Sequence, residues 1–254
     1  MLTSELIAGS PAPGLRGDVL GYVGYAQHSP VPHERREPPG TEVHLILSLG
    51  PRMEVDGHER TSFVAALDPG PATTRFVGDQ HGVEVRLTPL ATHRLLGGVP
   101  MEELCLPVVA LDDLLGAEAG LLVEQLAETD WRGRFALLDR VVAARLDAGP
   151  PVPVELGWAL GALGRGMSAG AVARELGWSD RRLLRAFRRC VGVPPTVYGR
   201  IVRFRRSTRL LGTMPLADAA LSAGYYDQAH MTRDFRQFAG VTPGAYVGSV
   251  QDAA

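Results

Sequence analysis

The sequence predicts an α+β domain, made of a small antiparallel sheet or barrel with helices, followed by an all-α domain. Three observations predict this. Short, partly alternating segments closed by Gly, Pro or Asp occupy residues 41–89. Helical periodicity replaces them afterwards. In the last hundred residues one sequence pattern occurs twice.

The first domain is expected to begin irregularly, because residues 10–40 are rich in Pro and Gly. Strands are predicted in EVHLILSL, RMEVDG, SFVAAL, TTRFVG and GVEVRLTPL. Helices are expected near 117–127 and 134–146. The second of these carries an apolar stripe that can pack on the sheet or on a second copy of itself: Phe135, Leu138, Val141, Val142 and Leu146.

A stiff break marks the predicted domain boundary. The run Asp147-Ala-Gly-Pro-Pro-Val-Pro cannot continue a helix, so we place the domains at 1–150 and 151–254. The second is predicted to be helical at about 154–163, 169–176, 180–190, 196–211, 216–223, 228–238 and 243–247. Ser168, Ser179 and Asp227 stand where N-caps belong.

The repeated pattern lies within this second domain. Written 48 positions apart, residues 179–198 and 227–246 place Arg185 on Arg233 and Phe187 on Phe235. Each copy follows an Ala-rich run that ends in Gly and an aromatic residue, Gly177-Trp178 or Gly224-Tyr225. A helix, a Gly turn and a second helix form a helix-turn-helix. Two such units are therefore predicted, at about 168–192 and 215–240, joined by a long helix at about 195–211.

Charge separates the two domains. Residues 1–152 hold 12 Arg against 21 Asp and Glu, and residues 153–254 hold 14 Arg against 7. A basic domain on an acidic protein indicates a polyanion partner, of which nucleic acid is the commonest. A merely solvated basic surface is the alternative that charge alone leaves open.

The second helix of each unit is predicted to read DNA in the major groove, because its stripe of apolar residues leaves the opposite side free. Arg matches guanine, Gln matches adenine, and Ala can touch a thymine methyl. The predicted base-reading residues are Arg181, Arg182, Leu184 and Arg185 in the first unit and Gln228, Ala229, His230 and Arg233 in the second. The predicted phosphate contacts are Ser179, Arg188, Arg203, Thr232 and Arg236.

Alternatives remain for several of these residues. Arg185 and Arg233 could instead clamp phosphate or pair with a carboxylate such as Glu175 or Asp234, and His230 could be a phosphate contact or a packing residue. Reading helices in successive grooves would lie about one turn, ~34 Å, apart. The turn glycines are 47 residues apart rather than 48. The second unit thus has one extra residue before its reading helix, and two unlike half-sites are predicted.

Two sets of residues in 168–247, one in each unit, form a recognisable pattern. They are Ala173, Leu176, Gly177, Trp178, Ser179, Leu183, Arg185, Phe187, Gly192, Pro195, Tyr198 and Arg203 in the first, and Ala220, Gly224, Tyr225, Asp227, Gln228, His230, Arg233, Asp234, Phe235, Arg236, Gly240, Thr242, Pro243 and Tyr246 in the second. With these residues, the segment resembles the DNA-binding domain of the AraC/XylS family of bacterial transcription regulators.

The resemblance implies a two-unit DNA-binding domain that regulates promoters, usually under the control of a fused companion domain. Some of these companion domains are cupin-like barrels, which are similar in layout to residues 1–150. Ala219, Met231 and Ser207 depart from the family pattern, which implies looser packing in the second unit.

Catalytic and metal-binding patterns are sparse. Cys105 and Cys190 lack metal-ligand spacing, and both are predicted to be reduced packing residues. A metal site using Glu42, His33, His44 or His81 is an option, but no pair has ligand spacing, and scattered surface or strand histidines are the favoured interpretation. Nucleophile-elbow, Walker and dinucleotide motifs are absent. We therefore expect no enzyme activity, metal or cofactor.

Two functions compete at this point. The favoured one is a cytoplasmic transcription regulator that binds double-stranded promoter or operator DNA. Its other partners would be a small-molecule effector, a second copy bound through the helices within 117–146, and the transcription machinery, with no membrane partner. The alternative is a metal-dependent cupin-type enzyme fused to a DNA-binding domain. A metal held by several His and Glu side chains would favour the enzyme.

Overall fold

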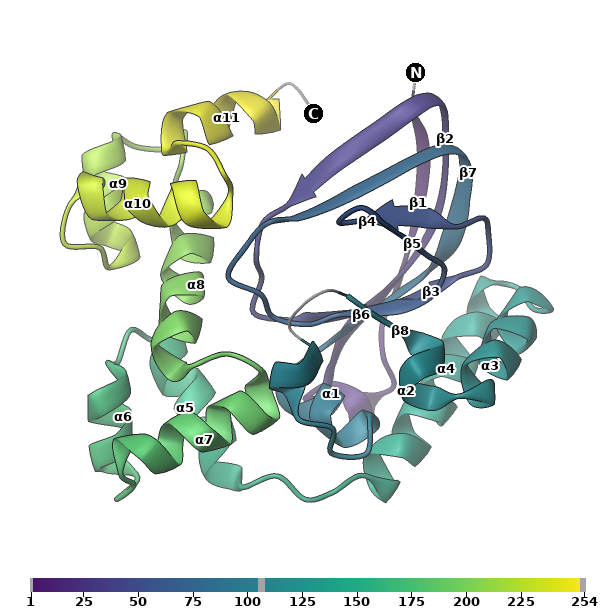
Figure 1. The fold of residues 1–254 in the computed structure, drawn as a ribbon, viewed down its shortest axis with the longest axis horizontal. Helices are drawn as coiled ribbons and strands as arrows, with labels where there is room; N and C mark the ends of the chain where they lie inside the picture. Colours follow the sequence, from purple (N-terminus) through teal and green to yellow (C-terminus); the bar gives the residue numbers. More distant parts are fainter. Residues whose placement is uncertain (1, 105–107, 252–254) are drawn as a thin grey trace.

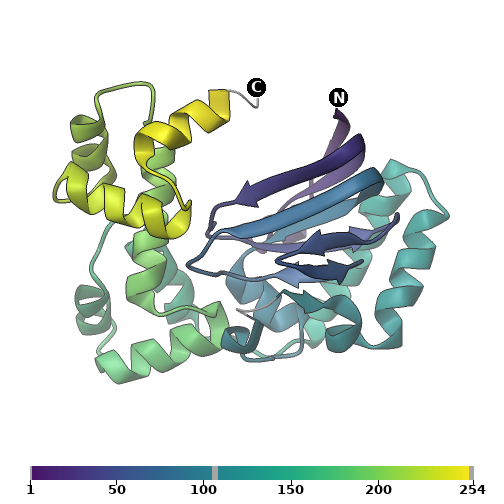
Figure 2. The same ribbon diagram turned by 45° about the horizontal axis from the view of Figure 1, so that its top comes forward.

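The structure is a computed structural model that describes residues 2–104 and 108–251. A curved antiparallel sheet and the helices that cover it form the N-terminal part, and a group of helices lies beside it (Figure 1). The turned view shows the same separation (Figure 2). The predicted order, an α+β domain and then an all-α domain, is confirmed. Cys105 lies outside the described residues.

The sheet has eight strands in the described part of the chain, and all of its pairings are antiparallel. The path runs β1-β2-β7-β3-β6-β8, while β4 pairs with β5 and β7. The strands are β1 (Thr3–Gly9), β2 (Val19–Glu37), β3 (Val43–Ser48), β4 (Met53–Val55), β5 (His58–Arg60), β6 (Phe63–Ala65), β7 (Ala72–Leu87) and β8 (Val109–Ala110).

The expectation of irregular loops over residues 10–40 is wrong, because the 19-residue strand β2 occupies much of this segment. Pro30 and Pro32 misled the prediction, since proline cannot donate to a sheet ladder. The pairing of β2 with β7 breaks between Ser29 and His33, where these prolines lie. An irregularity in the register therefore accommodates them without ending the strand. Two predicted strands within 73–90 are likewise one strand, β7.

Helices cover one face of the sheet. They are α1 (Pro89–Leu95), the 3-10 helix η2 (Met101–Leu104), α2 (Leu111–Leu115), α3 (Ala117–Ala127) and α4 (Trp131–Ala148); a second 3-10 turn, η1 (Pro13–Leu15), precedes β2. The ring of Phe135 on α4 stacks on Tyr22 of β2 with centroids 5.7 Å apart. The Tyr22 hydroxyl donates to Asp139 at 2.8 Å. The predicted stripe of α4 thus packs on the sheet.

Seven helices follow within the described residues: α5 (Val154–Gly164), α6 (Ala169–Glu175), α7 (Asp180–Val191), α8 (Pro195–Thr208), α9 (Leu216–Ala223), α10 (Gln228–Phe238) and α11 (Pro243–Gln251). All seven predicted helices are present; α8 ends three residues earlier than expected, and α11 is longer. No helix among the described residues is long and apolar enough to span a membrane.

The apolar core does not divide at the predicted domain boundary. One cluster of buried side chains extends from the sheet and α4 through α5 and α6 to Phe187 and Val191 of α7. A second cluster, centred on Phe204, Phe235 and Phe238, belongs to the second helix pair. The first helix pair therefore shares a core with the N-terminal domain, and the second has its own.

Candidate nucleic-acid interface

The two helix pairs α6–α7 and α9–α10 have the same turn geometry. In the first, the amide of Trp178 donates to the Ala173 carbonyl at 2.9 Å, and in the second Tyr225 donates to Ala220 at 2.9 Å. The glycine before each aromatic residue has positive φ, 63° at Gly177 and 92° at Gly224. Glycine adopts this conformation without the steric cost of a Cβ. The repeat in the sequence is therefore a repeat in structure.

In the first pair, α7 buries Leu183, Phe187 and Cys190. Ala173 of α6 is buried too, as the predicted contact between the two helices requires. Burial raises the pKa of the Cys190 thiol, which fits a packing residue. The opposite side of α7 exposes the predicted reading residues Arg181, Arg182 and Arg185 and the predicted phosphate contact Arg188, whereas Leu184 is half-buried.

The second pair repeats this division. Met231, Phe235 and Phe238 of α10 are fully buried against α8 and α9. The small residues Ala219, Ala220 and Ala223 of α9 are buried too. Phe204 of α8 lies edge-on to Phe235, with centroids 4.8 Å apart. The exposed side of α10 carries Gln228, Ala229, Arg233 and Arg236.

One predicted reading residue in each unit packs against the aromatic residue of its turn. The guanidinium of Arg182 lies 4.2 Å from the ring centroid of Trp178. His230, which the 48-residue offset places on Arg182, meets the Tyr225 ring edge-on at 5.1 Å. These contacts orient both side chains at the start of their helices, so the packing alternative for His230 has direct support.

Helices α7 and α10 both begin with a side-chain cap, as predicted. The Ser179 hydroxyl accepts from the Arg182 amide at 3.2 Å, and the Asp227 carboxylate accepts from the His230 amide at 2.6 Å. Each cap satisfies an amide that the helix leaves free. The Thr232 hydroxyl donates to the Gln228 carbonyl at 2.9 Å, which ties it to its own helix.

The arginines of α8 serve mainly to hold the units together. Arg200 donates to Asp234 of α10 from Nε at 3.1 Å and from Nη2 at 2.6 Å. Asp234 is thus occupied by Arg200, and no pair between Asp234 and Arg233 is seen in the described residues. Arg206 donates to the Gly164 carbonyl at 3.0 Å. Arg203, a predicted phosphate contact, lies with its guanidinium 5.8 Å from the Tyr225 ring centroid, so much of its side chain supports the second turn.

Comparison with known proteins agrees with this geometry. The sequence model of the helix-turn-helix domain family matches residues 172–249. This segment is therefore similar to helix-turn-helix domains. The resemblance to AraC/XylS-type regulators is thereby confirmed for the C-terminal part of the chain. Within this helix-turn-helix domain, the assignment of individual residues to bases and phosphates stays a prediction.

A curated relative of the helix-turn-helix domain is the uncharacterized HTH-type transcriptional regulator YbfI of Bacillus subtilis (strain 168). It is 40% identical over 57 residues, which are 22% of this chain and 20% of that protein. The match thus spans about a fifth of the relative's length.

Solved structures of ToxT from Vibrio cholerae resemble the whole chain weakly. One has a TM-score of 0.48 at 10% identity, covering 96% of this chain and 97% of its own. A second, with bound unsaturated fatty acid, has a TM-score of 0.43 at 10% identity, covering 96% and 94%. Likenesses this low carry no conclusion about what this chain binds.

The N-terminal domain contacts both units of the helix-turn-helix domain. The elements α1 and η2 pack against α7, and His93 of α1 lies near Arg189 of α7. At the other unit, Arg36 of β2 lies beside Gly240, the residue of positive φ between α10 and α11. A Cβ at Gly240 would approach the Arg36 Nη1 to 2.5 Å.

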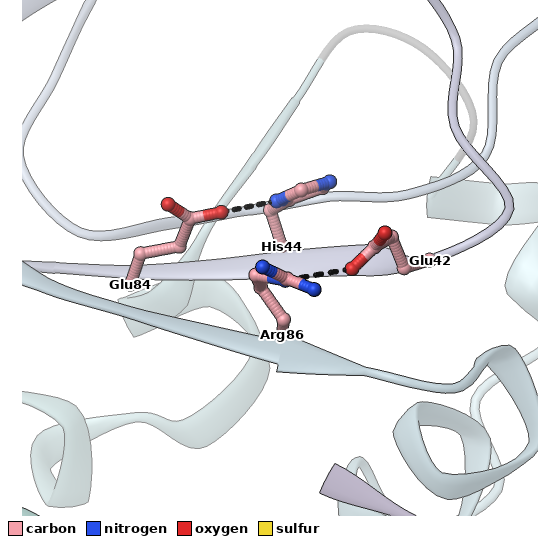
Figure 3. Close-up of polar contacts among 4 residues, drawn as sticks. All are labelled: Glu42, His44, Glu84 and Arg86. Atoms are coloured by element: carbon pink, nitrogen blue, oxygen red, sulfur yellow. Dashed lines mark hydrogen bonds and ion pairs between the residues drawn. The ribbon is translucent and has the colours of Figure 1, made fainter. Parts of the chain in front are cut away.

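Polar residues gather on the face of the sheet that the helices leave uncovered (Figure 3). His44 of β3 is bonded through Nδ1 to Glu84 of β7 at 2.5 Å, and Arg86 donates to Glu42 at 2.8 Å. Burial alone would raise the pKa of Glu84, but His44 and Arg86 outweigh it and lower the pKa. Each carboxylate therefore has a hydrogen-bonding partner in this cluster.

The histidines considered as metal ligands are dispersed. His33 lies edge-on to Phe76 with centroids 5.6 Å apart and accepts from Arg35 at 3.0 Å. His81 lies three residues before Glu84 on β7, so the alternation of side chains along a strand turns the two to opposite faces of the sheet. Among the described residues no group of three His, Cys, Asp or Glu side chains could hold a metal ion.

Proposed function

We propose that this protein is a sequence-specific DNA-binding transcription regulator whose helices α7 and α10 read two adjacent major-groove elements. One observation carries the proposal: the same helix-turn-helix geometry occurs twice, and each second helix is buried on one side and polar on the other. The similarity of residues 172–249 to helix-turn-helix domains supports it.

The exposed residues suit base recognition. Arg185 and Arg233 are exposed, and neither has a hydrogen bond or ion pair to the described part of the protein. A guanidinium that is free in this way can donate two hydrogen bonds to O6 and N7 of guanine. Gln228 and Ala229 at the start of α10 fit adenine and a thymine methyl. Different residues at equivalent positions imply two unlike elements, about ten base pairs from centre to centre.

The N-terminal domain is proposed to control this activity as a sensing and dimerising domain. Helices α3 and α4 are the proposed contact between two copies, and Leu121 is an exposed apolar side chain on α3. A small-molecule effector and the transcription machinery are the other proposed partners. Analytical ultracentrifugation of the full chain and of a Leu121→Asp variant would test the contact, because the variant should shift a dimer towards monomer.

Selection of bound duplexes from a random pool by the full chain tests the DNA-reading role. A site of two elements is expected. Arg185→Ala should relax the base preference in one element and Arg233→Ala in the other, each at about 1 to 3 kcal/mol of discrimination. Arg16→Ala, at an exposed arginine at the end of η1, is the matched control and should leave the preference unchanged.

Binding of the wild-type chain to all sequences alike would contradict sequence-specific recognition. Retention of the wild-type preference by both Arg185→Ala and Arg233→Ala would contradict the role given to these arginines. In either case electrophoretic mobility shifts over a range of salt would show how much binding remains through phosphate contacts.

A further inference from the structure

Tyr226 is the extra residue that distinguishes the second unit from the first. The first unit passes from Gly177 through one aromatic residue, Trp178, to the cap of α7. The second unit passes from Gly224 through the equivalent Tyr225 and then Tyr226 to the cap of α10. Trp178 and Tyr225 are both buried, whereas Tyr226 is 87% exposed. The insertion thus places a phenol on the surface directly before a reading helix.

Exposure alone would say little, because isolated apolar side chains are common on protein surfaces. The phenol of Tyr226 has no hydrogen bond or ring contact within the described residues. Its neighbour Tyr225 already fills the apolar position at the turn and contacts His230 and Arg203. Tyr225 therefore provides the aromatic packing that the turn needs, and the phenol of Tyr226 is available to a partner.

The charged residues near Tyr226 indicate which kind of contact with DNA the second unit lacks. The helix α7 carries five arginines and one aspartate, whereas α10 carries two arginines and one aspartate. The cap of α7 is the neutral Ser179, and that of α10 is the acidic Asp227. The first turn of α10 thus lacks the arginines with which α7 can meet phosphate. A neutral hydrogen-bond donor there can contact phosphate without adding another charge.

We propose that the Tyr226 hydroxyl donates a hydrogen bond to a backbone phosphate of the second DNA element. Tyrosine is among the side chains that make such contacts, which fix register without reading bases. The residue before a reading helix lies at the edge of the groove rather than on its floor, where the phosphates run. This inference rests on the proposed function, since it needs α10 to enter a major groove.

Quantitative binding by the full chain to its selected duplex tests the inference. Tyr226→Ala and Tyr226→Phe should each weaken binding about five- to tenfold, because both lack the hydroxyl. The slope of log affinity against log salt should stay at its wild-type value, since a neutral donor releases no counterion. Arg236→Ala should instead reduce that slope by about 1. Val154→Ala, at another highly exposed apolar residue (85%), is the control and should bind as the wild type does.

The outcomes separate the two proposals. Wild-type affinity in Tyr226→Ala overturns the inference, and so does full affinity in Tyr226→Phe with a loss in Tyr226→Ala, which would assign the contact to the ring. In both cases the selected duplex is still bound and the proposed function stands. Failure of the wild-type chain to select any duplex overturns the proposed function, and the inference with it.

Discussion

Arginines of the C-terminal domain divide into two groups that the sequence does not distinguish. Arg200 and Arg206 have hydrogen-bond acceptors on neighbouring helices, whereas Arg185 and Arg233 are exposed with none in the described residues. All lie on helices at similar spacings, so periodicity could not tell a structural arginine from one available to DNA. The partner of Asp234 had to be found from the packing of α8 on α10.

Arg200→Ala should destabilise the second unit, because it leaves the Asp234 carboxylate, 2% exposed, without its cation. The expected loss in the free energy of unfolding is about 2 kcal/mol, which is below the usual cost for a fully buried pair because Arg200 is partly exposed. Urea denaturation measures it. Arg209→Ala, at an exposed residue just beyond α8, is the control. The double variant Arg200→Ala with Asp234→Asn should recover part of the loss, and no recovery would contradict the ion-pair explanation.

At the scale of elements, helices were predictable where caps, glycines and apolar stripes agree. The bounds of α9 and α10 follow from such local signals, and those of α7 are within one residue. The strand β2 could not be predicted in this way, because its pairing with β7 compensates for the missing hydrogen-bond donors of its prolines. A pairing between strands this far apart in the sequence cannot be predicted from the residues of either strand alone. The exposed sides of α7 and α10 were predictable from their apolar stripes, but the ring contacts at Trp178 and Tyr225 were not.

The contact of α1 with α7 should weaken in mild acid. His93 is buried and donates from Nδ1 to the Val99 carbonyl at 2.9 Å. Burial lowers its pKa, and Arg189 lowers it further. The folded protein thus binds the proton less readily than the unfolded chain, whose histidine titrates near 6.5. Stability is complete above this pH and falls as pH drops through 6.5 towards the lower folded pKa.

Urea unfolding at pH 7.5 and at pH 5.5 measures this dependence. His93→Gln should lose stability less steeply between the two pH values than the wild type does. His58→Gln, at an exposed histidine of β5, should keep the wild-type dependence. Asp and Glu side chains contribute to the pH dependence of stability mainly at lower pH, because their ordinary pKa values lie near 4. Equal slopes in His93→Gln and the wild type would contradict the assignment to His93.

For the whole molecule, the two helix-turn-helix units are held differently. The first shares the apolar core of the N-terminal domain, and the second meets that domain where Arg36 lies beside Gly240. The predicted boundary between 150 and 151 follows the proline-rich break, which local composition reveals. A single apolar core nevertheless extends across this break, and it includes residues far apart in the sequence, such as Leu104 and Val191. No local sequence pattern predicts that such residues share a core.

Removal of the Arg36 side chain should loosen the second unit alone. In Arg36→Ala, hydrogen exchange at the amides of α10 and at residues 243–247 should become about two- to fivefold faster, because local opening costs less. Exchange in α7 should not change. Arg35→Ala is the matched control, since Arg35 lies on the opposite side of β2 and donates to His33. Equal acceleration in both units, or none in either, would contradict this difference.

The shared core also bears on how the chain folds during its synthesis. The N-terminal domain emerges first, but its surface formed by α1 and η2 has no cover until α7 has left the ribosome. Until then the parts of α1 and η2 that contact α7 in the finished protein are open to water. The N-terminal domain therefore acquires its final surface only when the first helix-turn-helix unit docks onto it, whereas the second unit has a core of its own.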